Sequence, residues 1–334
     1  AGTTVLVAST DDGEQVVVGP VDGGEGVYSV RAFGAVGDGV ADDTAAIQSA
    51  IDAAADGGIV HFPPGDYACT GALTIPETVR LRGTTIEHGS PGGRTRLRFS
   101  TDADGFVAIT CGSYVIIENL IVRGTYTYAH TTTGIAGASV TLNGVSVGGF
   151  DRGVALTNAY YATATRCEFT RNAQHLRLFG CYNVNLYGCS FVDDSAYGYG
   201  DSNGIVIDTI RSLNMFGGSI EGYKIGITVG SGGVHLYGVY FETGAEGNMN
   251  AFGVNAGASD GVNVVMSGCT IYLNAHDYFL YIADGSTNAT VTAHGNLFCS
   301  GASSDSGIAY GLGSDTSNAF YLSGDNWDGV ADAA

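Results

Sequence analysis

The feature that most constrains the fold of this chain is a short apolar pattern that recurs along most of its length. An apolar residue is followed three positions later by a small or apolar residue and two positions after that by a large apolar one, as in Leu186, Cys189 and Phe191. From about residue 115 onward the pattern returns at intervals of roughly 20 to 30 residues, which is typical of proteins built from stacked repeats. The large apolar residues form one predicted column: Val122, Val147, Phe169, Phe191, Ile220, Phe241, Ile271, Phe298 and Trp327.

The segments inside each repeat alternate apolar and polar residues, as in VNLYG, VHLYG and GIVID. Alternation indicates strands, because helical repeats of this length need ten-residue stretches with apolar spacings of three and four. With 53 glycines and only 14% charged residues, the composition favours many short strands joined by tight turns. We therefore predict a single all-β solenoid in which like residues stack on like residues from coil to coil.

The amino-terminal part of the chain departs from this pattern. We predict one helix at about residues 43–56, since Asp42, Asp43 and Thr44 offer a cap and apolar residues then follow at helical spacing. Such a helix would cover the open end of the solenoid and protect its exposed strand edge. We expect residues 1–27 to form a strand segment or hairpin outside the solenoid, residues 28–334 the solenoid domain, and about 115–327 its regular coils.

The stretch AFGAVGDGVADDTAAIQSAIDAA, followed by GGIVHFPPGDYACTGALTIPETVRLRG, resembles the amino-terminal signature of the pectate-lyase-like right-handed β-helix superfamily. That superfamily includes phage tailspike depolymerases, pectin-acting enzymes and exo-glucanases. The resemblance covers about residues 28–83 and implies a right-handed parallel β-helix that binds extended polysaccharides along its side. It is specific for the fold and not for the chemistry, so Asp38, Asp42 and Asp43 within it are interpreted as turn and cap residues.

The charge of the chain narrows the range of partners. Its formal net charge is −20 and its only lysine is Lys224, so a nucleic-acid partner is disfavoured by repulsion from the phosphates. The acid excess fits a protein kept soluble in high salt, one that attracts divalent cations, or a biased genome composition. No apolar run reaches about 18 residues and the first residues do not form a signal-peptide pattern, so we expect no membrane insertion. The resemblance to tailspikes implies an extracellular or virion location and a homotrimer.

Seven cysteines are spread along the chain without the close pairs of a zinc site. Cys167, Cys189 and Cys269 fall at the same position of the repeat, which points into the predicted core. We therefore expect packed free thiols.

The sharpest candidate site is a pair of glutamates. Glu221 and Glu242 directly follow the column residues Ile220 and Phe241, so they should lie one strand spacing apart on neighbouring coils. Paired carboxylates can supply the acid and the nucleophile or base of glycoside hydrolysis. Asp194 and Asp201, from the long loop that precedes them, could supply the second group at the wider spacing of an inverting mechanism. The alternative is that all four are solvated acids on an acidic protein.

Other side chains could bind or deprotonate a sugar polymer. A lyase needs a base beside a uronate carboxylate, and the candidates are Lys224, Tyr223, His175 and Arg152. The loop tyrosines Tyr197 and Tyr199 could offer apolar ring faces to sugars. None of these residues has a diagnostic spacing, so each also has a purely structural interpretation.

No cofactor is required by this interpretation. Clustered carboxylates at Asp193, Asp194 and Asp201 could hold a calcium ion, although they match no known loop signature. The sequence thus predicts a polysaccharide-binding protein resembling a tailspike depolymerase, with hydrolysis favoured over elimination. The alternative is a receptor-binding or structural β-helix without catalytic activity.

Overall fold

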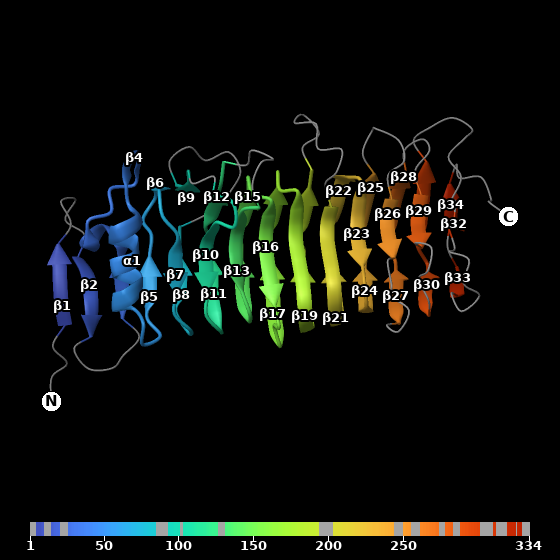
Figure 1. Cartoon of the computed structure of the whole chain (residues 1–334), viewed down its shortest axis with the longest axis horizontal. Helices are drawn as coiled ribbons and strands as arrows, with labels where there is room; N and C mark the ends of the chain where they lie inside the picture. Colours follow the sequence, from blue (N-terminus) through green and yellow to red (C-terminus); the bar gives the residue numbers. More distant parts are fainter. Residues whose placement is uncertain are drawn as a thin grey trace. The chain divides into compact units, whose positions relative to one another are not determined.

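The structure is a computed structural model that describes residues 5–9, 15–20, 26–84, 93–100, 103–125, 131–193, 203–243, 250–254, 261–273, 278–282, 288–300, 310–311, 319–324 and 326–328. It divides into two compact units, Ala1–Val154 and Ala155–Ala334. In each unit, short strands follow one another in coils that stack in chain order (Figure 1).

Unit 1 begins with an antiparallel hairpin, β1 (Val5–Ser9) and β2 (Gln15–Pro20). A short 3₁₀ helix, η1 (Val30–Phe33), and one α-helix, α1 (Thr44–Ala53), interrupt the strands that follow. The other strands are β3 (Val27–Ser29), β4 (Asp38–Asp42), β5 (Ile59–His61), β6 (Gly65–Cys69), β7 (Leu73–Ile75), β8 (Arg80–Arg82), β9 (Thr95–Phe99), β10 (Val107–Cys111), β11 (Val115–Glu118), β12 (Ile121–Arg123), β13 (Thr133–Gly137), β14 (Val140–Asn143), β15 (Ser146–Gly148) and β16 (Arg152–Thr157), whose last residues lie in unit 2.

Unit 2 continues with parallel strands, two of which are unusually long, β19 (Gln174–Tyr187) and β21 (Asn203–Phe216). The shorter strands are β17 (Tyr161–Thr165), β18 (Glu168–Thr170), β20 (Ser190–Val192), β22 (Ser219–Tyr223), β23 (Ile225–Val229), β24 (Gly232–Tyr237), β25 (Tyr240–Thr243), β26 (Asn250–Val254), β27 (Val262–Ser267), β28 (Thr270–Leu273), β29 (Tyr278–Ile282), β30 (Ala289–His294), β31 (Leu297–Ser300), β32 (Tyr310–Gly311), β33 (Ala319–Ser323) and β34 (Asn326–Asp328). The predicted parallel β-solenoid is thereby confirmed.

The predicted apolar column is present with the predicted register. In unit 1, Val122 pairs with Val147. In unit 2 the pairing runs without a slip from Phe169 on β18 to Trp327 on β34. The rings of Phe169 and Phe191 stack with their centroids 4.7 Å apart, and both are buried. The core of each coil is therefore built by stacking equivalent residues, as the repeat predicts.

A left-handed residue ends the strand that precedes each column residue of unit 2. Gly188, Gly217, Gly238, Gly268, Gly295 and Gly324 all have φ between 57° and 66° at this turn. Only glycine adopts such angles without steric cost, which explains why glycine recurs at this position of the repeat. Arg166 occupies the equivalent position before Phe169, with φ 50°, and is the one non-glycine residue of this set.

Helix α1 closes the edge of the first coils. Its apolar stripe of Ile47, Ala50 and Ile51 is buried. The side chain of Gln48 donates to the carbonyl of Thr74 and accepts from its N–H, both at 3.0 Å, so it occupies hydrogen-bonding groups that strand β7 would otherwise expose. No helix in the described part of the chain is long and apolar enough to cross a membrane.

All seven cysteines are free thiols, and all except Cys299 are buried. Burial raises the pKa of Cys111 to about 12, which keeps it protonated and unreactive. The six buried cysteines are therefore packing residues, as the repeat predicts for Cys167, Cys189 and Cys269.

Candidate functional site

The predicted acid pair lies on the outer face of unit 2. Strands β22 and β25 pair in parallel, with Ile220 opposite Phe241 and Glu221 opposite Glu242. The two apolar residues are buried, and both glutamates are partly exposed. Because partners on neighbouring strands lie about 4.8 Å apart, the two carboxylates share one patch of surface. The register that predicted this pair is confirmed.

Two tyrosines that sequence reasoning missed complete the patch. Tyr240 lies two residues before Glu242 on β25, hence on the same face, and its hydroxyl donates to Glu242 Oε2 at 2.7 Å. Tyr272 on β28 pairs with Glu242 on the other side. Burial, the hydrogen bond and the nearby glutamate charges raise the pKa of Tyr240 well above its ordinary value, so its hydroxyl stays a donor at neutral pH. Its spacing of two from Glu242 was the available signal.

A histidine and a tyrosine are buried below the surface that carries the acid pair. His175 is 0% exposed and Tyr223 is 2% exposed, and their rings meet edge to face with centroids 5.0 Å apart. His175 Nε2 donates to the carbonyl of Val192 at 3.1 Å. Burial lowers the pKa of His175 to about 4, and burial together with the charges of Asp193 and Glu221 raises that of Tyr223. Both side chains are therefore neutral at pH 7.

A local irregularity explains why Tyr223 points inward. Strict alternation along β22 would place Glu221 and Tyr223 on the same outer face. The pairing with β25 instead shifts between these two residues, where Gly222 has φ 82°. A β-bulge of this kind reverses the side on which the next residue lies. The sequence hypothesis gave Tyr223 and His175 a substrate-binding role, but the structure holds both below the surface.

The structure does not place all of the remaining predicted site residues beside Glu221 and Glu242. Lys224 follows Tyr223 and is exposed. Arg152 belongs to β16 in unit 1, where its Nε lies 3.7 Å from Asp151 Oδ2. Four predicted site residues lie outside the described residues: Asp194, Tyr197, Tyr199 and Asp201.

Three aspartates of the amino-terminal stretch, Asp38, Asp42 and Asp43, accept hydrogen bonds from the backbone. Asp38 accepts two backbone N–H groups, from Val40 and Ala41, and these hydrogen bonds lower its pKa. Asp43 accepts the N–H groups of two residues in the preceding turn and makes no side-chain cap to α1. Asp42 accepts from the N–H of Thr44 instead. The interpretation of these acids as turn and cap residues agrees with these contacts.

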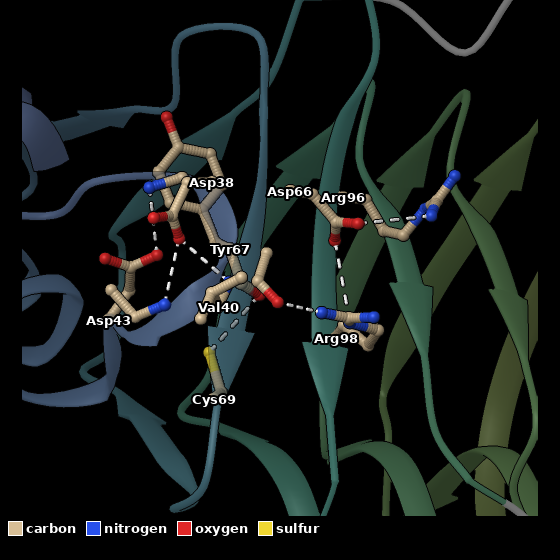
Figure 2. Close-up of polar contacts among 11 residues, drawn as sticks. Asp38, Val40, Asp43, Asp66, Tyr67, Cys69, Arg96 and Arg98 are labelled. Atoms are coloured by element: carbon tan, nitrogen blue, oxygen red, sulfur yellow. Dashed lines mark hydrogen bonds and ion pairs between the residues drawn. The ribbon is translucent and has the colours of Figure 1, made fainter.

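A second polar cluster in unit 1 joins one acid to two arginines. Figure 2 shows Asp66 between Arg96 and Arg98. Arg96 donates to Asp66 Oδ2 at 3.3 Å, while Arg98 Nε lies 3.8 Å from Oδ1 and its guanidinium also donates to the carbonyl of Gly39. Partly exposed ion pairs of this kind contribute little to stability, and here they connect β9 to β6 and to β4. Among the described residues no group of three or more His, Cys, Asp or Glu could hold a metal ion.

Comparison with known proteins agrees with this fold. The family described as rhamnogalacturonase A/epimerase, pectate lyase-like, matches residues 27–105. Mannuronan C5-epimerase AlgE2 of Azotobacter vinelandii is 52% identical over 65 residues, which is 17% of this chain and 6% of that protein. The chain thus spans only a small part of the curated relatives that it matches.

Two solved structures extend the likeness to nearly the whole chain. The A-module of mannuronan C-5 epimerase AlgE4 of Azotobacter vinelandii has a TM-score of 0.55 at 16% identity and covers 91% of this chain and 96% of that one. The tailspike gp49 of Acinetobacter baumannii bacteriophage Fri1, a capsular polysaccharide depolymerase, has a TM-score of 0.63 at 15% identity and covers 90% of this chain and 58% of that one. At such identities they establish the fold alone, and the predicted resemblance to pectate-lyase-like β-helix proteins is confirmed.

Proposed function

We propose that this protein binds a polysaccharide across the outer face of β22, β25 and β28 and cleaves it by glycoside hydrolysis. The observation that carries the proposal is the register pairing of Glu221 with Glu242, both partly exposed, with the hydroxyl of Tyr240 bonded to Glu242. A separation of one strand spacing corresponds to the short carboxyl distance of retaining glycosidases, about 5–5.5 Å. The similarity to a mannuronan C5-epimerase and to a capsular polysaccharide depolymerase supports a polysaccharide as the ligand.

The roles within the pair follow from the hydrogen bond. Tyr240 donates to Glu242 Oε2, which holds this carboxylate in a fixed orientation, so we assign it as the nucleophile. Glu221 is then the acid that protonates the leaving glycosidic oxygen. In a retaining reaction the Glu242 carboxylate bonds to the anomeric carbon as the sugar–oxygen bond breaks. Water then releases the sugar, with Glu221 accepting its proton.

Elimination is the second candidate reaction. The similarity to mannuronan C5-epimerases favours a uronic acid polymer as one of the sugars to test. Lys224 is an exposed base close in sequence to Glu221 and would be the candidate to remove a proton. A protein that binds glycan without cutting it is the third outcome, and the same assay identifies it.

One assay distinguishes hydrolysis from elimination. Purified surface and uronic acid polysaccharides are incubated with the protein, reducing ends report hydrolysis, and absorbance of an unsaturated product reports elimination. Reducing ends without unsaturated product support the proposal. Binding with neither product would contradict it in favour of a receptor-binding or structural protein.

The proposal also includes where the protein is located, how many copies assemble and which ions it needs. The tailspike likeness supports an extracellular or virion location, and a homotrimer is the expected state of assembly. The net charge of −20 supports high salt as a working condition. A calcium ion at Asp193, Asp194 and Asp201 stays a prediction, and the proposed hydrolysis requires no cofactor.

A further inference from the structure

One face of unit 2 carries no formal charge. It consists of the outward side chains of β17, of residues 183–187 in β19, of residues 212–216 in β21, and of β24, β27 and β30. These six segments contain no Asp, Glu, Lys or Arg, in a chain that has 33 acidic residues. Strands β18, β22 and β25 of the same unit, by contrast, all carry glutamates. We call these outward side chains the uncharged face.

Exposed aromatic rings line the carboxyl-terminal end of these strands. Tyr187, Phe216 and Tyr237 are 42%, 40% and 40% exposed. They stack in one row, with successive centroids 5.2 Å apart and planes within 8° and 10° of parallel. Near the start of the strands, Tyr160 and Tyr182 stack in the same manner at 4.7 Å, and both are exposed. Large apolar surface is thus exposed at the carboxyl-terminal end of the uncharged face, whereas at the other end the Arg211 guanidinium lies over the Tyr182 ring, 5.7 Å from its centroid.

Between the aromatic rows a hydrogen-bonded network fixes the polar side chains. Asn214 Nδ2 donates to the amide oxygens of Asn183 at 3.2 Å and Asn185 at 3.0 Å. Its own amide oxygen accepts from Ser212 and lies 3.0 Å from His235 Nδ1. The network spans three neighbouring coils, so this face is an ordered surface.

We propose that the uncharged face binds a second copy of this chain. Depletion of charge together with exposed tyrosine and phenylalanine is the composition that distinguishes the centre of protein interfaces. Each copy carries a net charge of −20, so two copies repel, and this repulsion is weakest when the surfaces brought together lack acids. This inference deepens the proposed assembly of several copies and is independent of the acid pair.

The geometry favours a protein over a glycan on this face. A sugar packs against the open face of an aromatic ring. Both faces of Phe216 are covered by Tyr187 and Tyr237, so its edge is what remains exposed. The amides at the centre likewise bond to one another. At the centre of the face, Phe216 thus offers a sugar polymer no open ring face, and the Asn214 amide is already hydrogen-bonded.

The size of the face predicts the strength of the contact. Six strands about 4.8 Å apart and five residues long cover roughly 25–30 Å by 16 Å, or on the order of 400 Å² before side-chain relief. A standard stable interface buries about 800 Å² on each partner. We therefore expect a reversible association that depends on concentration and strengthens with salt, because salt screens the repulsion between the acidic copies.

Sedimentation velocity of the full chain tests the proposal, over a wide concentration range and from about 0.05 to 1 M NaCl. We expect a concentration-dependent rise in mass that is larger at high salt. Phe216→Glu, and Asn214→Asp, which preserves side-chain shape, should each weaken association at least tenfold. The matched control is Tyr114→Glu, which replaces an exposed ring of unit 1 with the same charge and should associate like the parent. Circular dichroism verifies the fold of each variant.

Three results would overturn the inference. The first is a monomer at every concentration and salt, and the second is association that survives both variants of the face. The third is a loss of glycan binding in these variants without any change in mass, which would make the face a sugar site. Glycan cleavage is measured in parallel, so failure of the acid-pair proposal is recognised separately from failure of this one.

Discussion

The buried His175 predicts a specific loss of stability in acid. Burial lowers its folded-state pKa to about 4, from 6.5 in the unfolded chain. Between these values the unfolded state binds more protons than the folded state, so the free energy of unfolding falls as pH falls from 6.5 to 4. The pKa difference corresponds to roughly 3 kcal/mol, fully lost only below pH 4.

The measurement compares the parent with His175→Gln, whose amide nitrogen reaches the position of Nε2 and can donate to the Val192 carbonyl but does not titrate. Reversible denaturant unfolding at pH 7, 6, 5 and 4 gives the free energy of unfolding of each protein. We expect the difference between them to change by up to about 3 kcal/mol across this range, with the parent losing more. Parallel pH dependences would refute the reasoning, since they would mean that His175 is not buried as a neutral group.

Three further predictions test the core, the site and the ion. Phe191→Ala, which removes the ring stacked on Phe169, should cost about 3–5 kcal/mol in denaturant unfolding. The exposed control Tyr161→Ala should change stability by about 0.5 kcal/mol or less, and equal losses would contradict the register. Tyr240→Phe should lower the hydrolysis rate about tenfold, or about 1.4 kcal/mol, whereas an unchanged rate would remove Tyr240 from the site. EDTA should leave hydrolysis unchanged, and a loss that calcium restores would show that an ion is required.

Much of the fold could be predicted because a solenoid requires the same kind of residue at the same position in every coil. The column residues recur in every coil, so the spacing from Ile220 to Phe241 sets both the register and the position of the glutamates that follow. The position of a side chain directly after a column residue is therefore predicted as accurately as the position of the column residue itself. Glu221 and Glu242 could be predicted for that reason.

The rest of the site depends on departures from the repeat. The bulge at Gly222 turns Tyr223 into the core, and nothing distinguishes that glycine from the others of a chain that holds 53. His175 lies within β19, where the alternation is irregular, and its burial depends on contacts with Tyr223 in the next coil. Such residues do not recur at the interval of the repeat, so the periodic pattern of the sequence does not reveal them.

The uncharged face was equally hard to anticipate from the chain alone. Tyr187, Phe216 and Tyr237 lie 29 and 21 residues apart, and only the strand register brings them into one row. An exposed aromatic residue next to a turn glycine looks like one more apolar residue of the repeat. Only its neighbours in the folded structure show that it belongs to a row of stacked, exposed rings.

The most direct test of the proposed function is the hydrolysis rate of Glu221→Gln and Glu242→Gln on a polysaccharide that the parent degrades. Each substitution preserves shape and removes the ionisable group, so turnover should fall at least a hundredfold, on the order of 3 kcal/mol, while binding of the polymer persists. The parent should show a bell-shaped pH profile, because one carboxyl group must be protonated and the other ionised. Parental rates in both variants would contradict the account and leave Asp194 and Asp201 as the next pair to test.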